Sequence, residues 1–131
     1  MQVPAGEALS PTDRQQLERA VAVAERFSGL RFSVFLGVSE EDARAYAERL
    51  HSGLPDPDHS VLVMCDPAFH ALEIVTGAQT RRVLDDYDCR LAAATMRTSF
   101  AAEDILGGLV TGVQQLGLAA RKPKTLHASR T

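Results

Sequence analysis

The stretch Ser60-Val61-Leu62-Val63-Met64-Cys65 decides the fold, because it is a continuous apolar run with the length of one strand. The loop before it, residues 54–59, contains Pro55 and Pro57, which keep the residues that precede them out of the helical region. An unbroken apolar strand is typical of a sheet that carries helices on its faces. The sequence therefore predicts an α/β domain that includes a strand over residues 60–65.

Upstream of this strand the sequence predicts a helix, a strand and a second helix. Ser10-Pro11-Thr12-Asp13 is a capping signal, and apolar residues then recur at three- and four-residue steps until Gly29. Residues 31–38 alternate like a strand and are apolar on both faces, which predicts an interior strand. Ser39-Glu40-Glu41-Asp42 begins the second helix and Gly53 ends it. This strand-helix-strand order predicts a right-handed parallel crossover.

Downstream, a short turn over residues 66–70 predicts that residues 71–76 form an antiparallel hairpin with the strand before them. Residues 80–84 are expected to form a short helical turn. A helix then runs from residue 86 or 87 to about residue 100, and its apolar positions include Leu91, Ala94 and Phe100.

A last helix begins at Glu103-Asp104 and is expected to end near Leu118. Three glycines, Gly107, Gly108 and Gly112, lie within it and lower its stability unless the helix packs closely against a neighbour. Together these elements predict an α/β fold, a three-layer α/β/α sandwich with a small mixed β-sheet.

Length and composition predict one folded domain. The chain has 131 residues, of which 45% are hydrophobic and 24% charged. We expect an N-terminal tail over residues 1–9, a single α/β domain over 10–120 and a flexible basic tail over 121–131.

The net charge of −3 conceals an acidic body, because residues 121–131 hold four basic and no acidic side chains. The other 120 residues hold 10 basic and 17 acidic side chains, a net charge of −7. This balance argues against nucleic-acid binding by the domain, while the tail could contact an acidic partner or an anionic surface weakly.

The sequence gives no sign of export or of a membrane span. Residues 1–9 lack a basic region and an apolar run, and no apolar stretch approaches the about 20 residues that cross a bilayer. Cys65 and Cys89 form no C-x-x-C motif. We therefore expect a cytoplasmic location with two reduced, packed thiols.

Four acidic residues are candidate ligands for a hard cation. Asp66 follows a strand, where open α/β sheets bind ligands, and Asp56, Asp58 and Asp86 could converge with it on Ca²⁺ or Mg²⁺. The alternative is that Asp56 and Asp58 form turns and that Asp86 caps the following helix. Asp104 lies in the first turn of a helix, where the helix dipole favours an acid.

The histidines and two arginines give further candidates. His51, His59 and His70 lack the spacing of metal ligands and are expected in solvent, but His59, beside Asp58, could bind a metal or act as a base. Arg81 and Arg82, just after the Gly77 turn, could clamp an anion or could simply lie on a solvated helix face.

Three stretches carry a family resemblance that spans about residues 12–118. They are Asp58-His59-Ser60-Val61-Leu62 before the strand, Ile74-Val75-Thr76-Gly77 with the later Leu84-Asp85-Asp86, and the late set Phe100, Asp104-Ile105 and Gly108-Leu109. With the order of elements, they resemble the TPM domain, the family of thylakoid-lumen photosystem-repair phosphatases and related membrane-anchored proteins. Twelve Arg against two Lys suit an actinobacterial sequence, so the chain resembles a short actinobacterial branch of that family. We expect this branch to have neither a signal peptide nor a membrane anchor.

The resemblance implies a weak metal-dependent acid phosphatase that acts on phosphomonoesters. That family has an acidic-Asn-Gly segment before its central strand and a Gly-x-Gly-Leu-Glu segment after the following strand. The Asn, the second Gly of the latter segment and its Glu shape the loops of the metal and phosphatase site. They are absent in this chain, where Gln79 and Arg81 stand in place of the Gly and the Glu. The sequence thus favours a noncatalytic interaction or regulatory module with a protein partner, and leaves the phosphatase as the alternative.

Overall fold

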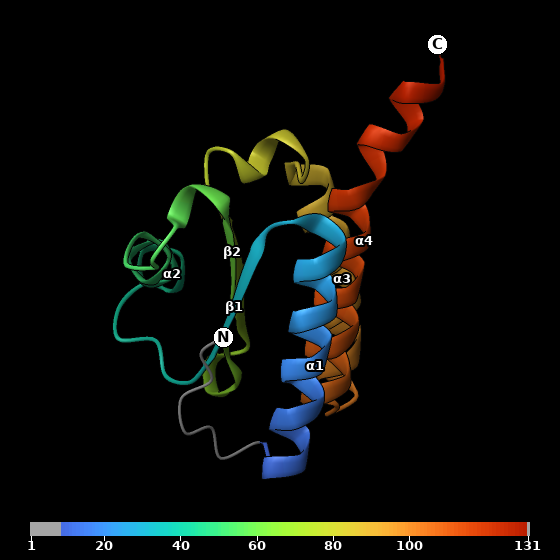
Figure 1. Cartoon of the computed structure of the whole chain (residues 1–131). Helices are drawn as coiled ribbons and strands as arrows, with labels where there is room; N and C mark the ends of the chain where they lie inside the picture. The colour runs from blue at the N-terminus through green and yellow to red at the C-terminus, as the bar shows by residue number, and fades with distance from the viewer. Residues whose placement is uncertain (1–8, 131) are drawn as a thin grey trace.

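Along the chain, a helix, a strand and a second helix are followed by two consecutive strands and then by two helices (Figure 1). The computed structural model describes residues 9–130, and the side chains of residues 9–121. The helices are α1 (Pro11–Ser28), α2 (Ala43–Ser52), α3 (Asp86–Ala101) and α4 (Ile105–Arg130), and the strands are β1 (Arg31–Leu36), β2 (Ser60–Asp66) and β3 (Ala71–Thr76). Short 3-10 turns are Pro57–His59, Pro67–Phe69 and Thr80–Arg82. The predicted mixed α/β fold with four helices is confirmed.

The three strands form one mixed sheet in the order β1-β2-β3. β2 pairs parallel with β1, Val34 opposite Val63, and antiparallel with β3, where Val63 lies opposite Ile74. The prediction of an interior strand over residues 31–38 is wrong, because β1 is an edge of this sheet. Helices cover both faces of the sheet, so an edge strand is also apolar on both sides.

The two faces of the sheet contact different helices. Figure 1 shows α2 on one side and α1, α3 and α4 on the other. On the α2 side, Leu62, Met64 and Val75 pack with Tyr46 and Ala47. The larger core on the other side holds alternate strand residues together with apolar residues of the three remaining helices: Phe32, Val34, Leu36, Val61, Val63, Cys65, Leu17, Val21, Met96, Leu109, Val113 and Leu116.

The helix ends largely follow the predicted signals. Ser10 and Asp13 form a capping box at α1, and Gly29 ends that helix with a left-handed φ of 77°. Asp42 caps α2. At α3 the cap is Asp85, paired with Asp88, and not Asp86 as the sequence suggested.

The apolar positions of α3 noted in the sequence are not all buried. Ala92 and Met96 are buried, whereas Leu91 is 43% exposed and Ala94 is exposed. A shift of one residue turns a helix face by about 100°. Because α3 has few strongly apolar residues, its sequence alone does not determine which face is buried.

The close packing predicted for α4 is confirmed. A Cβ atom on Gly108 would overlap Phe100, one on Gly112 would overlap Met96, and one on Gly117 would overlap Ala24. These glycines let α4 approach α3 and α1. α4 continues to Arg130, so the end expected near Leu118 is wrong.

The tails stay predictions. Residues 1–8 and 131 lie outside the described residues, as do the side chains of residues 122–130, which include most of the basic tail. Within residues 9–130, no helix has both the length and the apolar character needed to cross a membrane.

Candidate functional site

The outer edge of β3 presents the backbone groups of every second residue. Gly77 N–H donates to Ser60 O across 3.1 Å, which fixes the alternation of the ladder between β2 and β3. By this alternation the backbone groups of Leu72, Ile74 and Thr76 point away from β2.

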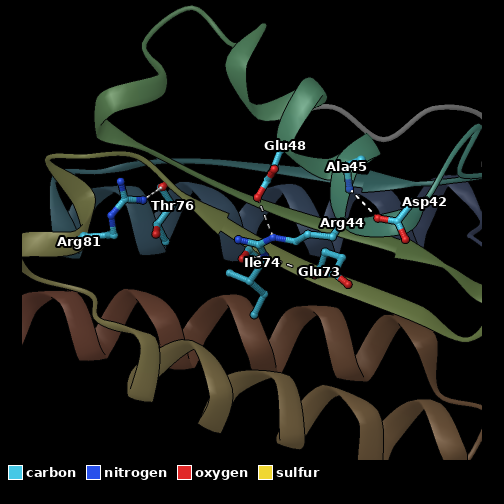
Figure 2. Close-up of polar contacts among 8 residues, drawn as sticks. All are labelled: Asp42, Arg44, Ala45, Glu48, Glu73, Ile74, Thr76 and Arg81. Carbon is cyan, nitrogen blue, oxygen red and sulfur yellow. Dashed lines mark hydrogen bonds and ion pairs between the residues drawn. The ribbon is translucent and has the colours of Figure 1, made fainter.

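Three arginines from three different segments bind the carbonyl oxygens on this edge. Arg97 of α3 donates to Leu72 O at 3.4 Å, Arg44 of α2 to Ile74 O at 3.0 Å, and Arg81 to Thr76 O at 2.6 Å. Figure 2 shows Arg44 reaching from α2 to Ile74 and Arg81 lying beside Thr76. We call these three side chains the arginine edge.

The arginine edge lines a groove of about 290 Å³ between β3, α2 and α3. Arg44 forms its α2 side. Its α3 side is formed by one face of that helix, because the residues are mostly three or four positions apart. They are Asp86, Cys89, Arg90, Ala93 and Arg97. Leu72, Ile74 and Glu73 of β3 also line it. The groove therefore combines four guanidinium groups with two carboxylates.

The charges of this groove are unevenly paired. Arg44 contacts Glu48 at 3.0 Å and Glu73 at 3.3 Å. Burial lowers the pKa of Arg44, but hydrogen bonds and charges of the two glutamates outweigh burial and raise the pKa above its ordinary value. Among the described side chains, no carboxylate forms an ion pair with Arg81 or Arg97. Two of the three guanidinium groups are thus available to an anion.

Cys89 is the residue of this groove that could act as a nucleophile if it ionised. Burial, with a smaller contribution from Asp86, raises the pKa of its thiol to about 11. A nucleophilic cysteine reacts as its thiolate, and this thiol stays protonated near neutral pH. The groove is therefore equipped to bind an anion and not to attack one through sulfur.

Of the residues singled out from the sequence, Arg81 and Asp86 line the groove. Arg82 turns to its own segment and donates to Gln79 Oε1 at 3.1 Å. Gly77 lies against the backbone of Pro57 and Asp58, where a Cβ atom has no room. Its role is to let the turn that carries Arg81 pack on the loop before β2.

The structure does not bring Asp58, Asp66 and Asp86 together. Asp58 precedes β2 and Asp66 ends it, so the length of the strand, roughly 20 Å, separates them. Asp66 is fully buried and accepts hydrogen bonds from Ser39 N at 2.8 Å and Ala68 N at 3.2 Å. Within the described part of the chain, no three His, Cys, Asp or Glu side chains are placed to share a metal ion.

The remaining candidates have local partners. His59 Nδ1 lies 3.1 Å from Asp56 Oδ1 and does not pair with Asp58. Asp104 accepts from Gly107 N at 2.9 Å at the start of α4. The expectation of a solvated His51 is wrong, because His51 is buried and its Nε2 lies 3.0 Å from Ser60 O. Since a carbonyl oxygen only accepts, His51 carries its proton on Nε2.

A larger hollow of about 620 Å³ lies beyond the carboxyl end of β2. Its lining is mainly apolar, and Arg97 belongs to it as well as to the groove. His70 and Glu103 also line it, with left-handed φ angles of 52° and 63°. Its lining includes one arginine, Arg97, whereas the lining of the groove includes four.

Arg44 and Arg97 are functional candidates that sequence reasoning missed. Each lies on the polar side of its own helix, and no local motif marks it. Only the position of β3 at the edge of the sheet brings them to one strand.

Two solved structures have the same fold at low sequence identity. The NMR structure of BA42 protein from the psychrophilic bacterium Bizionia argentinensis has a TM-score of 0.81 at 20% identity, covering 90% of this chain and 85% of that one. The solution NMR structure of the N-terminal domain of cg2496 protein from Corynebacterium glutamicum has a TM-score of 0.74 at 13% identity, covering 90% and 77%. These likenesses concern the fold alone.

Sequence comparison finds relatives in Mycobacterium tuberculosis. "Uncharacterized protein Rv2468c" of strain ATCC 25618 / H37Rv and "Uncharacterized protein MT2543" of strain CDC 1551 / Oshkosh are each 28% identical over 104 residues, or 79% of this chain. The matched region spans 62% of the length of each relative. Residues 2–117 match the family described as "Domain of unknown function (DUF5130)", and because the match covers most of the chain, the protein belongs to this family.

Proposed function

We propose that this domain is a noncatalytic interaction module that binds an anionic group of its partner in the groove along β3. The observation that carries the proposal is the arginine edge, in which three segments each supply one guanidinium to the same strand. The body around it is acidic, with a net charge of −7 over residues 1–120. In such an acidic body, a local cluster of cationic side chains favours binding of an anion at that cluster over nonspecific attraction of anions to the whole surface.

The hydrogen bonds to β3 orient the arginines for a ligand. A guanidinium has five N–H donors, and each arginine of the edge uses one of them on its carbonyl. The other donors of Arg81 and Arg97 can form the paired contacts that carboxylate and phosphate groups favour. Because the side chains are already held, less entropy is lost when an anion binds.

The TPM resemblance, which we retain as a proposal, supports the noncatalytic assignment. That family has a Glu where this chain has Arg81, and Arg81 lies in the groove. A cation in place of an acid disfavours a bound metal ion and favours an anion.

Helices on both faces of the sheet support the finer description as a three-layer, TPM-like sandwich. Two unpaired thiols support a cytoplasmic location.

Nuclear magnetic resonance of the full chain tests the anion site. Arginine Nε–Hε and backbone N–H signals are followed while sodium phosphate is added at constant ionic strength. We expect saturable shifts at Arg81, Arg97 and β3, and affinity about tenfold lower in Arg81→Gln and in Arg97→Gln. Arg26→Gln, an exposed position on α1, is the matched control and should bind like the wild type.

Two results would overturn the proposal. The first is an absence of saturable shifts, or equal losses in the control variant. The second is hydrolysis of p-nitrophenyl phosphate with Ca²⁺ or Mg²⁺ that disappears in Asp86→Ala, since this would make the domain the metal-dependent phosphatase that the family resemblance implies.

A further inference from the structure

We infer that the anionic partner is a short, extended peptide segment with acidic residues at alternate positions, which lies along the arginine edge. This inference rests on the proposed function, because it names the partner that the groove would bind. It is carried by the spacing of the three arginines along β3.

The carbonyls that hold the arginines belong to residues 72, 74 and 76, every second residue of a strand. A strand rises by about 3.3 Å per residue, so neighbouring anchor points are separated by roughly 6.6 Å. Side chains on one face of an extended peptide repeat at the same distance. Carboxylates at positions i and i+4 of a peptide therefore come into register with Arg97 and Arg81, and position i+2 lies opposite Arg44, whose guanidinium already contacts Glu48 and Glu73.

The arginine edge also determines how the peptide can approach. Each guanidinium covers one outward carbonyl of β3, so a partner strand cannot pair its backbone N–H groups with those carbonyls. Recognition is then through carboxylate side chains that meet the row of guanidinium groups. The apolar parts of the groove, such as Leu72 and Ala93, can contact small residues between the acids.

The groove fits a short acidic peptide better than a long polyanion. Its volume of about 290 Å³ holds only a few side chains. Glu73 and Asp86 in its lining repel multiply charged phosphates more strongly than single carboxylates. A nucleic acid would extend past the groove onto a body with a net charge of −7.

Two blocked peptides with the same composition and charge test the spacing. One has the order Glu-Ala-Glu-Ala-Glu and the other Ala-Glu-Glu-Glu-Ala, and each is titrated into the full chain by nuclear magnetic resonance. We expect the alternating peptide to bind at least about fivefold more tightly, since only it presents carboxylates at positions i and i+4 on one face, where Arg97 and Arg81 can pair with them. We expect Arg81→Gln and Arg97→Gln to remove this preference and Arg26→Gln to keep it.

Equal affinity for the two peptides, or no binding of the alternating one, would overturn the inference. Sodium phosphate titrated into the same sample separates the two proposals: if phosphate still binds at Arg81 and Arg97, the anion site stands and only the peptide assignment is lost. Tighter, arginine-dependent binding of a single-stranded oligonucleotide with three phosphates would also overturn the peptide assignment.

Discussion

Gly77 lies so close to the carbonyl oxygen of Pro57 that a Cβ atom on residue 77 would overlap this oxygen. The contact joins the turn after β3 to the loop before β2. Two backbone hydrogen bonds reinforce the contact, from Gly77 N–H to Ser60 O and from Gln79 N–H to Asp58 O. Because Arg81 follows in the same turn, this close approach positions one end of the arginine edge.

Replacement of Gly77 by alanine should therefore destabilise the protein. The new methyl group meets backbone atoms that cannot move aside, and overpacking of this kind costs about 1–3 kcal/mol. Urea unfolding measures the loss. Gly53→Ala is the matched control, because a Cβ atom there lies 3.6 Å from Leu50 O, an ordinary contact. A similar loss in both variants would show that the close approach is not the cause.

The buried imidazole of His51 should stabilise the start of β2. His51→Ala removes a buried side chain and its hydrogen bond to Ser60 O, and should lower the free energy of unfolding by about 1–3 kcal/mol. The exposed His59 is the control, and His59→Ala should change stability by no more than about 0.5 kcal/mol. Equal effects of the two substitutions on urea unfolding would contradict the structural role of His51.

The thiol of Cys89 should make the protein less stable in alkali. Burial raises its pKa in the folded state from 9.0 to about 11. Below pH 9 both states hold the proton, but between pH 9 and pH 11 the unfolded chain loses the proton and the folded chain keeps it, so stability falls as the pH rises.

Cys89→Ala should reduce this fall, as measured by the difference between urea midpoints at pH 8 and pH 10. Cys65, with a pKa raised to about 12 by burial, keeps its own contribution in the variant. An unchanged pH dependence in Cys89→Ala would show that the thiol of Cys89 does not resist ionisation.

Glu103 provides a test of backbone conformation at the end of α3. Its φ of 63° is in the left-handed region that favours glycine, and Asp104 N–H next to it donates to Ser99 O. Glu103→Gly should raise the melting temperature, because the left-handed conformation costs a non-glycine residue about 1–2 kcal/mol and the greater freedom of glycine in the unfolded chain offsets only part of this gain. Glu103→Ala removes the same carboxylate without this freedom and should give no such gain. A gain in the alanine variant would trace the effect to charge.

Much of the fold could be predicted from local signals. Capping residues at Ser10 and Asp42 and the glycine at residue 29 mark helix ends through hydrogen bonds with near neighbours in sequence. The apolar run over residues 60–65 and the turn after it predict the parallel and antiparallel pairings of β2.

Features that depend on long-range packing could not be predicted. The edge position of β1 depends on how many strands the sheet contains, and the buried face of α3 depends on which side meets α4. Burial of His51 depends on its contact with Ser60, nine residues later.

The candidate site was predictable only in part. Arg81 is marked by the preceding Gly77 turn, whereas Arg44 and Arg97 resemble any solvated helix arginine in the sequence. They become a group because β3 exposes the carbonyls of Ile74 and Leu72 at an edge between α2 and α3. A strand edge is a property of the sheet, which no local motif encodes.

Charge reversal at Arg81 tests most directly whether the arginine edge binds anions. The dissociation constant of sodium phosphate is measured from the Nε–Hε signal of Arg97 in the wild type and in Arg81→Glu, after circular dichroism has shown that the variant folds. The structure predicts saturable binding to the wild type and none to Arg81→Glu. Equal phosphate affinity in the two proteins would contradict the claim.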